Sequence, residues 1–283
     1  MRTMKRSFAL AALVAVPLVS QAIVIRHDVA DSEYTNLGNS FSGVGRVHSG
    51  GTGTLLTSEW VITAAHVVAG VSSTNFTAGG VTRSSSAIFV NPGYNPSDLG
   101  NGMDIALIRL STAITNTDTY WLYSGTDELS QIGTAIGFGE TGTGLTGRVP
   151  GSGGTKRAGH NALDEYLDSR ETVFLTDFDS GDANDNFIGD ATPEDLEFNV
   201  APGDSGGSLM LFQNGQWKVA GITSFYANLD GVTNGDYGDF SGFMRINSAG
   251  NKEWIEQVTA VPEPTTLAIL GLGAAALLRR KRK

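Results

Sequence analysis

The chain has 283 residues, no cysteine and a formal net charge of −10 at pH 7. Such an acidic protein is repelled by nucleic acid and anionic membranes, and the lack of cysteine excludes disulfides, thiol chemistry and cysteine metal ligands. Gly, Thr, Ser and Val are frequent and long amphipathic helical patterns are rare, which favours an all-β fold.

Residues 1–22 have the pattern of a secretory signal peptide. Three basic residues precede an apolar run from Phe8 to Val19, and Ser20-Gln21-Ala22 places small residues at the expected cleavage site. The alternative, a retained membrane anchor, needs a longer apolar run. We therefore predict export and cleavage after Ala22, which makes Ile23 the new N-terminus.

His66 follows a run of apolar and β-branched residues, Trp60-Val61-Ile62-Thr63, and the short segment Ala64-Ala65. This pattern predicts a buried strand that ends just before the imidazole, at the rim of a core. His27, His48 and His160 have no comparable setting. His66 is the candidate general base, and a hydrogen-bonded core histidine is the alternative.

Asp104 is a lone carboxylate before the apolar, alternating segment Ile105-Ala106-Leu107-Ile108-Arg109-Leu110. Burying this charge unpaired would cost several kcal/mol, so we expect a hydrogen-bonding partner, and an imidazole N–H is a suitable one. The alternative is a carboxylate that only caps the start of a strand.

Two polar segments follow. Residues 140–161 are dominated by Gly, Thr and Ser and predict a surface loop, because no strand-to-helix frame encloses the glycines as a phosphate cradle would require.

In residues 177–186, Asp177, Asp179 and Asp182 alternate with other residues in a way that suits calcium, although the distal glutamate of an EF-hand is missing. A solvated acidic loop is the alternative, and no other cofactor or metal site is expected.

The segment Pro202-Gly203-Asp204-Ser205-Gly206-Gly207 surrounds a serine with glycines. Glycine can adopt backbone angles that aim the N–H groups of Gly203 and Ser205 into one concavity, as an oxyanion hole requires. Ser205 is therefore the candidate nucleophile. A polar turn between two strands is the alternative.

The C-terminus has the pattern of a second targeting signal. Val261-Pro262-Glu263-Pro264 precedes an apolar stretch from Thr265 to Leu278 and a basic end from Arg279 to Lys283. Residues 261–283 resemble the PEP-CTERM sorting signals of Gram-negative bacteria, which an exosortase processes during export. We expect a short membrane segment held by the basic residues, with a plain tail anchor as the alternative.

The segments Thr63-Ala64-Ala65-His66, Asp104-Ile105-Ala106-Leu107 and Gly203-Asp204-Ser205-Gly206-Gly207 occur in this order. Together they resemble the motifs of the trypsin-like (chymotrypsin-fold, S1 family) serine proteases, over residues 23–258. The resemblance implies two packed six-stranded antiparallel β-barrels, about 23–123 and 124–258, and a short C-terminal helix. The catalytic residues would lie at the junction of the barrels.

The resemblance also implies a role for each motif residue. His66, Asp104 and Ser205 would form the catalytic triad, and the N–H groups of Gly203 and Ser205 the oxyanion hole. Gly137-Phe138-Gly139 would correspond to the Gly-Trp-Gly segment of the family.

Activation and specificity are implied in the same way. A freed Ile23 would insert and pair its ammonium with Asp204, although Ile25-Arg26 replaces the Gly-Gly usual after such a terminus. Signal peptidase would then make the activating cut.

Four residues would shape substrate binding. By ungapped alignment, Asn199 lies at the base of the primary pocket, so strict cleavage after basic residues is disfavoured. Tyr226 would narrow the entrance, Ser241 would lie on the wall, and Ser224 would contact substrate backbone.

The sequence thus predicts an exported serine endopeptidase with protein or peptide substrates, which meets signal peptidase and exosortase on its way to the cell surface, extracellular matrix or medium. The alternative is a non-catalytic surface or matrix binding protein on the same scaffold. An esterase-like hydrolase fits less well, because the histidine comes first in the chain.

Overall fold

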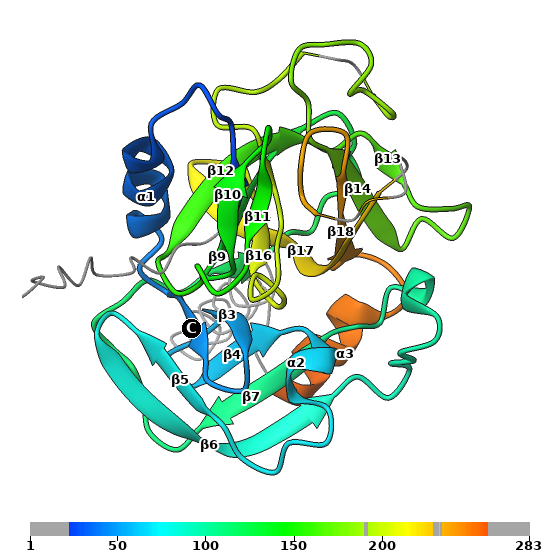
Figure 1. Cartoon of the computed structure of the whole chain (residues 1–283). Coiled ribbons are helices and arrows are strands. Elements are labelled where there is room, and N and C mark those ends of the chain that lie inside the picture. Colours follow the sequence, from blue (N-terminus) through cyan, green and yellow to red (C-terminus); the bar gives the residue numbers. More distant parts are fainter. Residues whose placement is uncertain (1–22, 190–191, 229–231, 233, 260–283) are drawn as a thin grey trace, which may run out of the picture.

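The computed structural model describes residues 23–189, 192–228, 232 and 234–259 (Figure 1). The predicted signal peptide, residues 1–22, and the sorting segment, residues 261–283, lie outside these residues. Within the described part, no helix has the length and apolar character needed to cross a membrane.

Six strands in the first half of the chain close into a barrel, in the order β2-β3-β4-β7-β6-β5. They are β2 (Val44–Val47), β3 (Gly51–Leu55), β4 (Trp60–Thr63), β5 (Asn75–Ala78), β6 (Val81–Val90) and β7 (Ala106–Leu110). Two short helical segments, α2 (Ala65–Val68) and η1 (Leu99–Asn101), lie in its connections. The barrel begins at Val44, later in the chain than the predicted start near residue 23.

The second half forms an eight-stranded sheet in the order β12-β9-β16-β17-β18-β14-β13, with β8 paired to β17. Its strands are β8 (Trp121–Leu122), β9 (Ile132–Gly137), β12 (Arg157–Ala162), β13 (Glu165–Tyr166), β14 (Val173–Asp177), β16 (Ser208–Gln213), β17 (Gln216–Ala227) and β18 (Phe240–Arg245). The two-residue strands β8 and β13 extend this sheet instead of closing it. The prediction of an all-β, trypsin-like fold is confirmed, but the second unit is a half-barrel and not a closed six-stranded barrel.

A four-stranded sheet joins distant segments, in the order β11-β10-β1-β15. Its strands are β11 (Gly147–Val149), β10 (Thr141–Thr143), β1 (Val24–Ile25) and β15 (Phe198–Asn199). Strand β1 runs parallel to β10 and antiparallel to β15. The first residues of the described chain are therefore part of the second unit.

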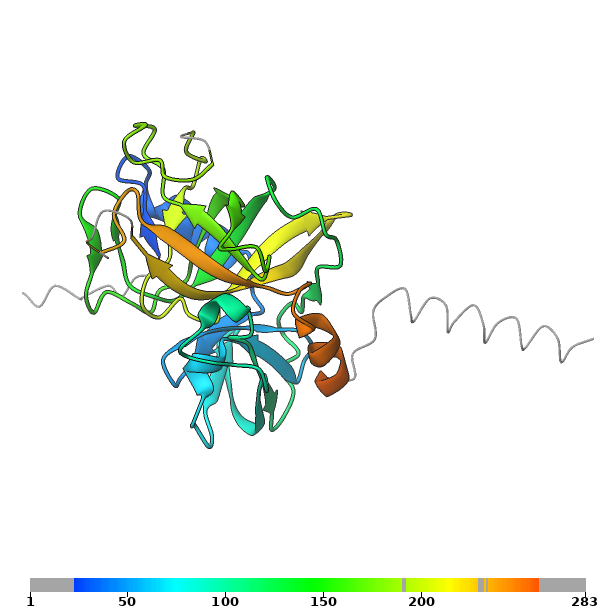
Figure 2. The same cartoon turned by 90° about the vertical axis from the view of Figure 1, so that its right-hand side faces the viewer.

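Two helices tie the ends of the chain to the units. Helix α1 (Asp31–Asn39) packs on β12, where a Cβ at Gly38 would lie only 2.8 Å from Arg157 Cα. The predicted C-terminal helix is α3 (Asn251–Thr259), beside the first barrel in Figure 2. Asn251 anchors its start by accepting from Asn91 Nδ2 at 3.1 Å and donating to the Gly102 carbonyl at 2.9 Å.

Candidate active site

His66 and Asp104 meet at two points. His66 lies in α2, directly after β4, and its backbone N–H donates to Asp104 Oδ1 at 2.8 Å. Its ring nitrogen Nδ1 lies 2.6 Å from Asp104 Oδ2. A carboxylate accepts only, so Nδ1 carries the proton and Nε2 is free to accept one. The Asp104 side chain is fully buried, whereas 34% of the His66 side chain is exposed, so the imidazole can reach a substrate.

Ser224 is a third partner of the same carboxylate. Its hydroxyl donates to Asp104 Oδ2 at 2.5 Å from strand β17. Ser224 is predicted from the sequence to contact substrate backbone, and its bond to Asp104 is not predicted, since no local pattern links residues 120 positions apart. With three donors, the buried charge of Asp104 is well solvated by protein groups.

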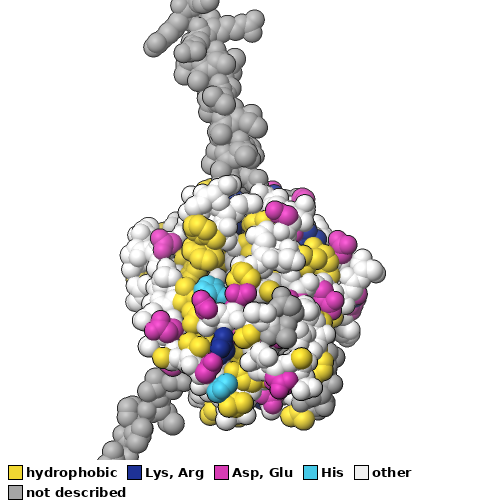
Figure 3. All heavy atoms as spheres, turned by 90° about the horizontal axis from the view of Figure 1, so that it is seen from above, with side chains coloured by type: hydrophobic (Ala, Val, Ile, Leu, Met, Phe, Trp, Pro, Cys, Tyr) yellow, Lys and Arg dark blue, Asp and Glu magenta, His cyan; other side chains and the backbone are white. Residues whose placement is uncertain are grey.

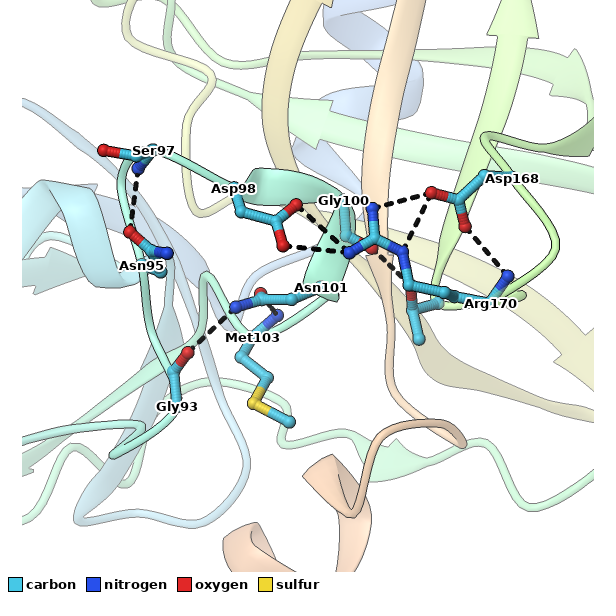
Figure 4. A network of polar contacts seen from close by, with 10 residues as sticks. Gly93, Asn95, Ser97, Asp98, Gly100, Asn101, Met103, Asp168 and Arg170 are labelled. Carbon is cyan, nitrogen blue, oxygen red and sulfur yellow. Dashed lines mark hydrogen bonds and ion pairs between the residues drawn. The ribbon is translucent and has the colours of Figure 1, made fainter.

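The loop that ends at Asp104 is fixed from both units (Figure 4). The Asn101 side chain donates to the Gly93 carbonyl and accepts from the Met103 N–H, both at 2.9 Å. Arg170, from the second unit, pairs with Asp98 of this loop at 2.9 Å and with Asp168 at 2.6 Å. The Arg170 guanidinium therefore links the loop that contains Asp98 to the second unit through ion pairs.

Ser205 lies in the connection between β15 and β16 and contacts both units. Its carbonyl accepts from the Thr52 N–H of β3, and the Gly206 N–H donates to the Thr223 carbonyl of β17, both at 2.8 Å. Gly206 has φ +82°, and a Cβ there would lie 2.8 Å from the backbone nitrogen of Ala64. The serine thus sits beside the turn that carries His66.

Among the described residues, the Ser205 hydroxyl has no hydrogen-bonding partner, and His66 Nδ1 contacts Asp104 instead. In free enzymes the bond between nucleophile and base is often long and tightens only with substrate bound. The structure therefore brings His66, Asp104 and Ser205 to one place, with a direct contact between the first two.

Two backbone N–H groups next to Ser205 are available for a ligand. Among the described residues, neither the Gly203 nor the Ser205 N–H donates to a protein acceptor. Gly203 has φ +100°, and a Cβ there would lie 2.8 Å from Gly139 Cα, so only glycine fits. Thr52 fixes the turn by donating its hydroxyl to the Gly203 carbonyl at 3.0 Å. This arrangement suits an oxyanion.

Asp204 and Ile23 lie together in the interior. The Asp204 carboxylate accepts from the N–H groups of Gly139 at 2.8 Å and Ala201 at 2.9 Å, and the Ile23 N–H also donates to it. Burial raises the pKa of Asp204 to about 7 against these lowering effects. Ile23 itself is 1% exposed. The Ile25-Arg26 departure is accommodated, since the Arg26 N–H donates to Tyr34 Oη at 3.1 Å.

A hollow of about 300 Å³ opens beside Ser205 and is lined by residues 200–202 and 223–226. Asn199 and Ser241 do not line it, because both are fully buried and the Ser241 hydroxyl donates to Asn199 Oδ1. Tyr226 lines the hollow and also packs on a buried cluster of the second unit.

A second hollow, of about 310 Å³, lies on the other side of Gly203. Arg46 and Phe138 are among the residues that line it. Pro202 lines both hollows, which therefore adjoin at the turn that precedes Ser205.

The three acids of the predicted calcium loop have different surroundings. Asp177 is buried and accepts from the N–H groups of Phe187 and Ile188 at 2.9 and 3.1 Å. Asp182 is exposed and accepts from the Asn184 N–H, while Asp179 borders a partly open pocket. In the part of the chain that the structure describes, no group of three or more His, Asp or Glu side chains is arranged to hold a metal.

Comparison with known proteins adds two matches. Residues 33–251 match the family model described as Trypsin, and residues 260–283 match the PEP-CTERM protein-sorting motif. This motif indicates export and sorting to the cell surface in Gram-negative bacteria.

Curated relatives match over much of the same region. Chymotrypsin-like elastase family member 1 of Homo sapiens is 29% identical over 201 residues, 66% of this chain and 74% of the relative. The protein of the same name from Rattus norvegicus is 27% identical over 195 residues, 62% of this chain and 68% of the relative.

Proposed function

Because the chain belongs to the trypsin family, we propose that it is an exported serine endopeptidase that cleaves proteins through a covalent acyl-enzyme. The observation that carries the proposal is the buried Asp104, which holds both the backbone N–H and the Nδ1 of His66 beside the Ser205 turn. A structural histidine needs neither a free Nε2 nor a serine with two open N–H groups next to it.

In the proposed mechanism, Ser205 Oγ attacks the scissile carbonyl carbon while His66 Nε2 takes the hydroxyl proton. His66 then gives that proton to the leaving amine as the C–N bond breaks, and Asp104 stabilises the transient imidazolium. The N–H groups of Gly203 and Ser205 bind the oxyanion, each contributing about 3 kcal/mol. Water, deprotonated by His66, then hydrolyses the acyl-enzyme and restores the serine.

The hollow beside Ser205, with Phe225 and Tyr226 in its lining, favours small, uncharged side chains on the residue before the scissile bond. Among the described residues, no carboxylate lines this hollow, so an Arg or Lys side chain would enter without an ion pair from them. Tyr226 lines the hollow and is the strand partner of the buried Ser241, which supports a role for this ring as the floor of the pocket.

Removal of the signal peptide would complete the site. The Ile23 backbone nitrogen already lies at the Asp204 carboxylate, so cleavage after Ala22 would place an ammonium beside a buried acid. Signal peptidase would thus be the activating enzyme, and exosortase would process the C-terminal segment later.

Labelling with a fluorophosphonate tests the proposal on the exported protein. We expect labelling of the natural sequence, loss of labelling in Ser205→Ala, and normal labelling in Ser49→Ala, which removes an exposed serine outside the turn. If the folded, processed protein does not label, the catalytic role fails and a surface or matrix binding protein becomes the better explanation.

A further inference from the structure

A third, partly open pocket lies away from the candidate active site. Its volume is about 200 Å³, and the residues that line it are Asn161, Ala162, Asp179, Thr192, Glu194 and Glu197. It is bordered by β12 and by the connection between β14 and β15, at the top of Figure 1. No residue of the proposed triad or substrate pocket takes part.

Glu197 is a buried acid with an unused oxygen. The residue is 1% exposed, and its Oε1 atom is buried without a hydrogen-bond partner. Its other oxygen, Oε2, accepts from the Glu194 N–H at 2.6 Å. Because leaving a buried carboxylate oxygen unpaired is unfavourable, the cavity is suited to a ligand that approaches Oε1.

The charges around Glu197 are negative. Burial raises the pKa of Glu197 well above its ordinary value, and the charges of Asp179 and Glu194 add to this, against the lowering effect of hydrogen bonds from the backbone N–H groups of the same two residues. Among the described residues, no Lys or Arg forms a salt bridge with Glu197. The Arg26 guanidinium donates to the Glu194 carbonyl at 3.0 Å and pairs with Asp28 at 2.7 Å. A cation that entered this pocket would therefore meet acidic side chains and an unpaired carboxylate oxygen of Glu197.

The lining determines which cation fits. All the polar side chains of the lining offer oxygen, as carboxylate, amide or hydroxyl, and none is histidine or cysteine. Hard oxygen ligands on an irregular loop suit Ca²⁺ better than zinc or copper, and better than Mg²⁺, which demands strict octahedral geometry. Acidic side chains are spread over the face above this region, with few basic ones (Figure 3).

We propose that this cavity binds one Ca²⁺ ion through the carboxylates of Glu197 and Asp179. The Asn161 amide oxygen, the Thr192 hydroxyl and water complete the shell, since no three acidic side chains of the described residues already surround one point. This site shares only Asp179 with the acids that the sequence singled out.

The ion would act on a structurally important segment. Glu197 immediately precedes β15, which pairs with the N-terminal strand β1 and contains Asn199. The Glu197 carbonyl also accepts from Tyr34 Oη at 2.9 Å, which links it to helix α1. Calcium would therefore stabilise Glu197 and the adjoining strand β15, which contact helix α1 and strand β1. This effect does not depend on whether the protein is an enzyme.

Calorimetric titration with CaCl₂ after dialysis against EDTA tests the site in the full chain carrying Ser205→Ala, which removes autolysis and activity from the readout. We expect one site with a Kd of about 10⁻⁴–10⁻³ M, and a rise in Tm of roughly 3–8 °C in 10 mM CaCl₂. Glu197→Gln, which keeps the side-chain shape, should weaken binding at least about tenfold and abolish the rise in Tm.

The matched control is Asp182→Asn, an exposed acid of the same connection outside the cavity. It should bind Ca²⁺ like the parent. Absence of binding heat in the parent, unchanged binding in Glu197→Gln, or loss of binding in Asp182→Asn would each overturn the proposal. If Glu197→Gln does not fold, Asp179→Asn takes its place with the same expected loss.

Discussion

Cleavage before Ile23 should change how the stability of the protein depends on pH. In the uncleaved chain, burial raises the pKa of Asp204 from the ordinary 3.8 to about 7. A folded-state pKa above the unfolded one stabilises the fold below the unfolded pKa, and this stabilisation disappears as pH rises through the folded pKa. The uncleaved protein should therefore lose stability between about pH 4 and pH 7.

The size of the effect follows from the pKa of Asp204. Each pH unit between the two pKa values corresponds to about 1.4 kcal/mol, so ionising Asp204 near neutral pH costs the uncleaved protein roughly 4 kcal/mol. After cleavage, the Ile23 ammonium pairs with the carboxylate and keeps it ionised, so this slope should vanish. Above about pH 8 the cleaved form should weaken, because its unfolded chain loses the α-amino proton.

The assay compares urea unfolding of two Ser205→Ala proteins, one beginning at Ile23 and one that keeps a single residue before it. We expect their free energies of unfolding to diverge by about 1.4 kcal/mol per pH unit from pH 5 to pH 7. Asp204→Asn in the extended protein should remove the slope. Parallel curves for the two proteins would refute the pairing of Ile23 with Asp204.

Three further substitutions test the site. Asp104→Asn presents an N–H to the Nδ1 of His66 and should lower kcat by about 10⁴-fold, measured on a peptide ester or amide; a loss below tenfold would exclude its orienting role. Tyr226→Gly should open the hollow toward Asn199 and raise kcat/KM for large apolar side chains over alanine by about 10–200-fold, read from a peptide library; an unchanged preference would show that this ring is not the floor. Arg170→Ala removes exposed, solvent-screened ion pairs and should leave the urea midpoint nearly unchanged; a large fall in the midpoint would mean that Arg170 is needed to hold the two units together.

The parts of the site that could be predicted from the sequence are those written in short segments. His66, Asp104 and Ser205 each lie at the end of a local pattern: a β-branched run, an alternating strand and a glycine turn. These local patterns predict the three positions correctly because each residue lies close to the end or the start of a strand. The all-β class follows from the same local preferences.

The rest depends on contacts between distant segments. The hydroxyl of Ser224 reaches Asp104, and Glu197 faces a cavity built from three separate segments, which no periodicity reveals. The half-barrel also differs from the predicted closed barrel, because closure depends on how strands pair across the sheet and not on their own composition. Local sequence patterns therefore identify the candidate catalytic residues, whereas tertiary packing determines which other residues contact and hold them.

The four-stranded sheet that contains β1 has a consequence for timing. Strand β1 pairs with β10 and β15, partners far along the chain, and contacts of such high sequence separation form slowly because long loops must close first. In a chain exported unfolded with its N-terminus leading, β1 would wait for the last-arriving partner, β15, before it can dock. The N-terminal strand would thus dock late, only once the chain as far as β15 has crossed the membrane.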